Sequence, residues 1–199
     1  ADAKKAGTDA AASVSALADG QVATNKTDIA GLKTKVESLE SVNYVAITNE
    51  QIDARLKEIL TIMKDAAHTP LETPTRSIGG LIGGEAKKTY EFSQTDNNLC
   101  GTFLSKAISY SMAVLEVNAT MGLIVAAPTA GSAGVLPGVL LSLQEYRNLS
   151  DESICSAIVH ASAIGYILMR NASVSGAEAG CQAEVGAASA MAASAVVEL

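Results

Sequence analysis

The N-terminal part of the chain carries apolar residues at a seven-residue period. This is the period of a coiled coil, in which two alternating sets of positions form the seam between helices. The first set is Val22, Ile29 and Val36, and the second is Asn25, Leu32 and Leu39. A polar residue on such a seam costs stability but fixes register and strand number. The pattern predicts a helix that pairs with other helices, or an amphipathic helix docked on its own domain.

Apolar residues at helical spacing recur over most of the remaining chain. They predict helices over 47–67 and 101–118, with the stripes Ile52, Leu56, Ile59, Met63 and Leu104, Ile108, Met112, Leu115. Two further helices are predicted over 151–169 and about 177–199. Small residues dominate the last one, so we expect it at the centre of a bundle. The predicted fold is all-α: a helical bundle with glycine-rich loops, plus the N-terminal heptad-repeat helix.

Local signals predict where these helices begin and end. Thr48 followed by Gln51 is a capping box, and Pro70 and Pro74 are expected to end the helix over 47–67. Ser150, followed by two acidic residues, is expected to cap the helix over 151–169. The two Gly-Gly pairs of "GGLIGGEAKK" (79–88) predict tight turns or close backbone contact. This segment lacks the Lys-Ser/Thr ending of a phosphate-binding loop.

The composition indicates how the core is packed and which partners are not expected. The chain of 199 residues is 48% hydrophobic but only 4% aromatic, without Trp, so we expect its core to form by close backbone approach. The 14 Lys and Arg residues against 21 Asp and Glu give a net charge of -7. Because this charge opposes attraction to a phosphate backbone, nucleic acid is not expected as a partner.

The cysteines and the apolar stretches indicate in which cellular compartment the protein is expected. Cys100, Cys155 and Cys181 are odd in number and form no CxxC pair, so a reducing, cytoplasmic location is expected rather than a disulfide scaffold. The stretch 121–143 contains two prolines, and the stretch 154–169 is shorter than the roughly 20 residues of a membrane-spanning helix. Both lack basic flanks and an aromatic belt, so we expect buried core and no membrane.

Single polar residues do not identify a reaction. His68 lies near a proline-containing connector, where we expect it to be solvated, and His160 lies in an apolar helix, where we expect a core position. No GxSxG motif indicates a catalytic triad, and the cysteine spacing does not indicate zinc. Composition, spacing and motifs therefore leave the catalytic residues unknown. Cys181, set among glycine and alanine near the end of the chain, is either a buried, inert thiol or a ligand.

Two long blocks carry a family resemblance. The blocks "EVNATMGLIVAAPTAGSAGVLPGVLL" (116–141) and "NASVSGAEAGCQAEVGAASAMAASAVVEL" (171–199) resemble the α chain of iron-sulfur-dependent L-serine dehydratase, also called L-serine deaminase. A weaker resemblance extends back through "GGLIGGEAKK" to "ITNEQIDARLKEIL", so that it covers about 47–199. Residues 22–39 instead resemble the stalk coiled coils of trimeric autotransporter adhesins. We therefore expect a coiled-coil-like segment at 1–41, fused or foreign, and a dehydratase-like domain at 42–199.

The resemblance implies a reaction and a cofactor. The family removes water from L-serine to give pyruvate and ammonia, a step in amino-acid degradation and gluconeogenesis, and uses a [4Fe-4S] cluster in place of pyridoxal phosphate. One iron of the cluster lacks a cysteine ligand and acts as a Lewis acid on the substrate hydroxyl. The cysteine of the family's "GCQ" motif is a cluster ligand, and Cys181 matches it. The small residues around Cys181 would leave room for the cluster.

The resemblance also implies a substrate loop. The segment "PTAGSAG" (128–134) matches it, so Thr129, Gly131 and Ser132 are expected to bind the substrate carboxylate through hydroxyl and backbone N–H groups. A plain turn between core helices is the alternative. Asn118, Glu178 and Gln182 also match family blocks, without an assigned role.

Differences from the family pattern lead to one more expectation. The family places two further cluster cysteines downstream, in "CDPVAG" and "VPC" blocks that this sequence does not contain. Cys100 and Cys155 are not expected to replace them, so we expect a C-terminally truncated chain that is inactive and carries no intact cluster. A separate β chain and a homo-oligomer are the expected partners. The alternatives are a relative that acts on cysteine, and a non-enzymatic assembly module linked to a coiled coil.

Overall fold

The computed structural model describes residues 15–17, 19–31, 33–34, 49–95 and 97–199. The chain divides into two compact units, 1–48 and 49–199. In the first unit the described residues are helical and exposed, including Val22 and Ile29 on the predicted seam. The Asn25 side chain accepts a hydrogen bond from Gln21 of the same helix, at 2.9 Å. Leu32, Val36 and Leu39 lie outside the described residues, so the coiled coil stays a prediction.

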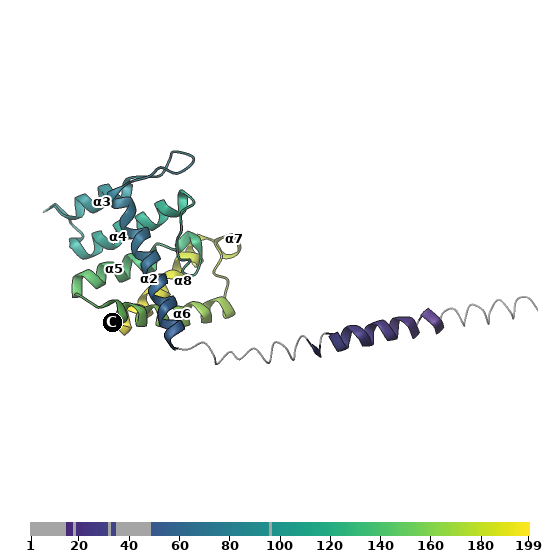
Figure 1. Ribbon diagram of the computed structural model, residues 1–199. Helices are drawn as coiled ribbons and strands as arrows, with labels where there is room; N and C mark the ends of the chain where they lie inside the picture. The colour runs from purple at the N-terminus through teal and green to yellow at the C-terminus, as the bar shows by residue number, and fades with distance from the viewer. Residues whose placement is uncertain (1–14, 18, 32, 35–48, 96) are drawn as a thin grey trace, which may run out of the picture. The chain divides into compact units, whose positions relative to one another are not determined.

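The second unit is built from helices around one core (Figure 1). Its elements are α2 (Asn49–Glu72), α3 (Glu85–Ser93), α4 (Gly101–Ala119), the 3-10 helix η2 (Ala130–Ser132), α5 (Val135–Arg147), α6 (Asp151–Asn171), α7 (Gly176–Ala179) and α8 (Cys181–Glu198). Figure 1 shows α3, α4 and α5 following one another in layers, with α2 packed across them, and α8 packs on both α5 and α6. No strand occurs among the described residues, and the all-α prediction is confirmed.

Glycines let α4 and α5 approach closely. A Cβ atom added at Gly134 would lie 2.3 Å from the carbonyl oxygen of Ser111, and one added at Gly138 would lie 2.6 Å from that of Ala107. Real Cβ atoms essentially never come so close to another heavy atom, so only glycine fits at either position. The expectation of a core formed by close backbone approach is confirmed at this helix pair.

This close approach decides which face of α4 is buried. The larger residues of the predicted stripe lie outward, with Leu104 48% exposed and Leu115 40% exposed. The inner face carries Ala107, Ala113 and the single large ring of Tyr110. The stripe correctly predicted a helix. The side of α4 that carries this stripe is not the buried side, because the neighbouring backbone of α5 leaves space mainly for small side chains.

Two predictions about helix ends are wrong. Pro70 does not end α2, which runs on to Glu72 and includes this proline in its last turns, where the ring is buried. A proline removes one backbone donor, and here burial of its ring offsets part of that loss. The last predicted helix is divided at Gly180, whose φ of 84° interrupts the helix between α7 and α8. The Thr48 capping box lies outside the described residues.

The glycine-rich loop agrees with its prediction. Gly80, Gly83 and Gly84 all have positive φ, and a Cβ atom at Gly83 would lie 2.2 Å from the carbonyl oxygen of Thr75. The chain therefore needs glycine there both for its backbone angles and for close contact.

α8 lies at the side of the bundle rather than at its centre. It packs on α5 and α6 through one face of mainly small residues, Ala187, Ala188, Met191, Ala192 and Ala195. Its other face is open, with Val185 47% exposed and Val197 88% exposed. The predicted central position is wrong, because the small residues fit against two helices and not against a surrounding ring. The most buried helix is α5.

α6 begins as predicted, with the Ser150 hydroxyl accepting a hydrogen bond from the backbone N–H of Ser153 at 3.2 Å. The helix has 21 residues, more than the apolar stretch 154–169, and among the described residues it alone is long and apolar enough to cross a membrane. Only 33% of the apolar window is buried. Core helices of folded proteins meet the same length and composition criteria. The absence of a membrane stays a prediction.

Candidate functional site

The predicted substrate loop forms a compact turn. Thr129 is extended and precedes η2, and its hydroxyl lies 3.0 Å from the hydroxyl of Ser132. Ser132 is 2% exposed, and its hydroxyl also lies 3.4 Å from the carbonyl oxygen of Ala127. The hydroxyl of Ser132 is therefore directed into the protein, whereas Gly131 and Ala130 are exposed.

Asn118 holds this turn from α4. Its side-chain amide donates a hydrogen bond to the carbonyl oxygen of Ala130 at 3.1 Å. The sequence matched Asn118 to a family block without assigning it a role, since nothing in the spacing of residues 118 and 130 shows that they meet. The structure shows that Asn118 orients the peptide group at the start of η2.

Glu184 of α8 brings a carboxylate to the same turn. The Thr129 hydroxyl donates a short hydrogen bond to Glu184 across 55 residues of sequence. A Cβ atom added at Gly131 would lie 2.6 Å from a Glu184 carboxylate oxygen, and one added at Gly176 would lie 2.6 Å from the other oxygen. Two glycines and one hydroxyl therefore lie against the carboxylate. Glu184 lies in the first turn of α8, where the helix dipole stabilises negative charge.

Cys181 begins the helix that carries Glu184. It is the first residue of α8, its thiol is free, and the residue is exposed. The preceding Gly180 has open space around it, because an added Cβ atom would meet nothing within 4 Å. Residues three apart on a helix share a face. One end of α8 thus connects Cys181 and Glu184 with the turn at 129–132. Because Cys181 is exposed, its interpretation as a buried, inert thiol is wrong.

The other cysteines lie elsewhere. Cys155 is buried in α6, and burial together with nearby Asp151 raises the pKa of its thiol. Cys100 is exposed just before α4, beside a groove of about 570 Å³ that Phe103 and Tyr146 also line. No group of three His, Cys, Asp or Glu side chains that could hold a metal ion occurs among the described residues.

A second polar cluster links α2, α4 and α5. The Tyr110 hydroxyl, on a residue 1% exposed, donates to Glu145 at 2.5 Å, and Lys106 donates to the other Glu145 oxygen at 2.7 Å. Burial, together with the bond to Glu145, raises the pKa of Tyr110. For Glu145, burial acts to raise the pKa, but the hydrogen bonds from Lys106 and Tyr110 outweigh it and lower the pKa overall.

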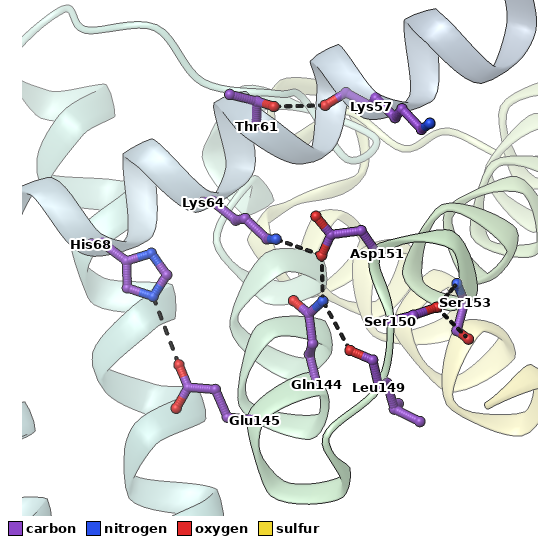
Figure 2. Close-up of polar contacts among 10 residues, drawn as sticks. All are labelled: Lys57, Thr61, Lys64, His68, Gln144, Glu145, Leu149, Ser150, Asp151 and Ser153. Atoms are coloured by element: carbon purple, nitrogen blue, oxygen red, sulfur yellow. Dashed lines mark hydrogen bonds and ion pairs between the residues drawn. The ribbon is translucent and has the colours of Figure 1, made fainter.

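Figure 2 shows how α2 reaches this cluster and the start of α6. The imidazole of His68 points at Glu145, with 3.8 Å between Nε2 and Oε1. One turn earlier, Lys64 donates to Asp151 at 2.6 Å, and Gln144 donates to the same oxygen at 2.7 Å. The hydrogen bond from Lys64, followed by that from Gln144, lowers the pKa of Asp151. These contacts join three helices, and they touch neither Cys181 nor the turn.

The prediction for His68 is wrong about its place in the chain, and the prediction for His160 is wrong. His68 lies within α2 rather than in a connector, because the helix continues through Pro70, and it packs edge-on against the Tyr110 ring at 5.1 Å. Its side chain is still 43% exposed, in line with the expected contact with solvent. His160 is not a core residue: its side chain is 50% exposed and lies 3.2 Å from Glu198 of α8. It lies on the outer face of α6.

Comparison with known proteins agrees with the resemblance. The family described as "Serine dehydratase alpha chain" matches residues 5–199, which include all of the heptad positions at 22–39. A Bacillus subtilis protein named "Probable L-serine dehydratase, alpha chain" is 44% identical over 152 residues, covering 76% of this chain and 50% of that protein. No solved structure matches the chain.

Two further relatives have similar names. The "L-serine dehydratase, alpha chain" of Peptoniphilus asaccharolyticus is 39% identical over 160 residues, covering 80% of this chain and 55% of the relative. An "L-serine dehydratase" of Helicobacter pylori strain J99 is 47% identical over 154 residues, covering 74% of this chain and 34% of the relative. The chain spans about half the length of the first two relatives. Since the family match covers nearly all of it, the chain belongs to the serine dehydratase alpha chain family.

Proposed function

We propose that this chain forms part of the catalytic chain of an L-serine dehydratase. The reaction takes a proton from Cα and the hydroxyl from Cβ of L-serine, and the resulting enamine becomes an imine that water hydrolyses to pyruvate and ammonia. The relatives named L-serine dehydratase support this assignment. So does the bond between Thr129 and Glu184, which ties the substrate loop to the helix that begins at Cys181.

The proposed role of Cys181 is to hold iron. Its thiol is free and exposed, and the glycine before it leaves open space. When bound, a [4Fe-4S] cluster supplies an iron that acts as a Lewis acid on the leaving hydroxyl. The described residues provide one accessible thiol for it at this end of α8. We therefore propose that this chain alone holds no complete cluster and does not turn over L-serine.

The proposed role of the turn is to bind and orient substrate. Gly131 is exposed at η2, so its backbone is open to an amino acid, and Asn118 fixes the adjoining peptide group. Ser132 is buried, so its hydroxyl supports Thr129 rather than reaching into solvent. A separate β chain and self-association are part of the proposal, as is a cytoplasmic location, which suits three free cysteines.

Iron and sulfide analysis tests the role of Cys181. In the full-length catalytic chain with its β chain, reconstituted without oxygen, we expect Cys181→Ser to lose most bound iron and pyruvate formation. Cys100→Ser is the matched control, since this thiol is also exposed but lies at the start of α4. Full iron, sulfide and turnover in the Cys181 variant would contradict the assignment.

Two comparisons test the proposed substrate and the proposed lack of a complete cluster. Pyruvate formation from L-serine and from L-cysteine separates a dehydratase from a desulfidase, and we expect L-serine to be preferred. The 199-residue chain alone should bind less than a full complement of iron and sulfide. A complete cluster with turnover in this chain would show that the incomplete-site proposal is wrong.

A further inference from the structure

The carboxylate of Glu184 has a hydroxyl partner, the side chain of Thr129. Thr129 donates to it, and the backbone at Gly131 and Gly176 lies against its oxygens. Among the residues that the structure describes, no lysine, arginine or histidine forms an ion pair with it. The side chain is only partly buried, so a small molecule can reach it.

This carboxylate changes what the turn can bind. A substrate carboxylate placed beside Thr129 would lie close to Glu184, and two like charges at short range repel strongly away from bulk water. An amino acid is a zwitterion, and its ammonium group is attracted to the position from which its carboxylate is repelled. Charge-assisted hydrogen bonds between an ammonium group and a carboxylate are among the stronger polar contacts in proteins.

We propose that Glu184 binds the α-ammonium group of the amino-acid substrate, while the exposed backbone of the 129–132 turn receives its carboxylate. This inference rests on the proposed function. A contact between Glu184 and the ammonium group would favour binding of an α-amino acid over a hydroxy acid, which lacks this group. It also explains why glycine occupies positions 131 and 176, since a side chain at either would displace the carboxylate.

A charge-neutral variant tests the role directly. Glu184→Gln keeps the size of the side chain and an oxygen that can accept from Thr129, but it removes the negative charge. Two ligands are compared in the full-length catalytic chain with its β chain and cluster: L-serine, and L-glycerate, in which a hydroxyl replaces the ammonium group. We expect the KM for L-serine to rise about 10- to 100-fold, the range for loss of a charged hydrogen bond. The inhibition constant of L-glycerate should stay within about twofold or decrease, because no ammonium contact is lost.

Glu91→Gln is the matched control. Glu91 is exposed on α3, which packs on α2 and α4, so this variant has the same charge change on a different part of the bundle. Its KM for L-serine should equal that of the unchanged protein. Equal weakening of L-serine and L-glycerate by Glu184→Gln would show that Glu184 only positions the turn. No weakening of either would also overturn the proposal.

The same comparison separates this inference from the proposed function. If the unchanged protein does not turn over L-serine, the dehydratase assignment fails, and calorimetric binding of the two ligands still tests Glu184. Selective loss of L-serine binding in the Glu184 variant would then support an ammonium site without the reaction. Unchanged L-serine binding in the Glu184 variant would overturn the ammonium site, whatever the outcome for the reaction.

Discussion

The hydroxyl of Tyr110 forms a hydrogen bond in a nearly closed part of the core. It donates to Glu145, which also accepts from Lys106, and the three residues come from two helices. A hydrogen bond to a charged group contributes more than one between neutral groups, but Glu145 is 38% exposed, so water moderates the gain. This cluster stabilises the fold and lies apart from the turn at 129–132.

Tyr110→Phe should lower the free energy of unfolding by about 1 kcal/mol at neutral pH. Because Glu145 has a lowered pKa in the folded protein, it contributes stability above its ordinary value of 4.5, and this contribution is lost as the pH falls through the folded value. Without the Tyr110 donor the contribution is smaller. The difference between the two proteins should therefore be largest above about pH 5 and narrow in acid. Urea unfolding at several pH values measures it.

Tyr166→Phe is the control for this prediction. Tyr166 is 63% exposed on α6, so its hydroxyl is hydrated in both states. We expect no measurable change at any pH. A difference for Tyr110→Phe that is constant from pH 3 to pH 7 would show that Glu145 is not the group involved.

At the scale of elements, backbone contact between helices decides which residues are tolerated. α4 and α5 touch at Gly134 and Gly138, four residues apart on one face of α5. The carbonyl of Ala107 cannot move away from an added Cβ atom without shifting α4. A glycine on an open helix face has no such limit, and Gly186 on α8 has nothing within 4 Å.

Gly138→Ala should destabilise the protein by about 1–3 kcal/mol, because overpacking outweighs the gain in helix propensity. Gly186→Ala should instead stabilise it by roughly 0.5–1 kcal/mol, since only the propensity changes. Thermal unfolding of both variants measures the opposite signs. A stabilising Gly138→Ala would mean that the two helices are not in the contact described.

For the whole molecule, the two compact units raise separate questions. The described residues of the first unit are exposed helix, with Val22 and Ile29 each 65% exposed. Exposed apolar residues at this spacing are typical of a helix that pairs with others. The family match includes most of this segment, although residues 22–39 have the pattern of a coiled coil.

Sedimentation of a peptide of residues 1–41 tests the coiled-coil prediction. We expect a concentration-dependent, helical oligomer, because the heptad seam is buried only on association. Asn25→Val should stabilise the oligomer and broaden its range of strand numbers, since the polar residue sets register at a cost in stability. A monomeric, unfolded peptide at all concentrations would contradict the prediction and remove the support for a structural role of this segment.

Predictions from sequence succeeded where neighbouring residues carry the information. Ser150 caps α6 through a contact three residues away, and the glycines at 80, 83 and 84 adopt the positive φ that their pairs indicated. They failed where packing outweighs local preference. Pro70 continues α2, and the large residues of α4 point outward, because the buried face is chosen by the neighbouring helices.

The order of side chains along the chain was enough to establish an all-α fold, its glycine turns and the family resemblance, since helix periodicity, caps and motifs are local. The tertiary structure decided which residues meet. Thr129 and Glu184 are 55 residues apart, and Lys106 and Glu145 are 39 apart. No local pattern carries such pairings, because they depend on how α4, α5 and α8 pack. The contact of the Glu184 carboxylate with the turn, and with it the proposed ammonium site, could therefore be identified only from the tertiary structure.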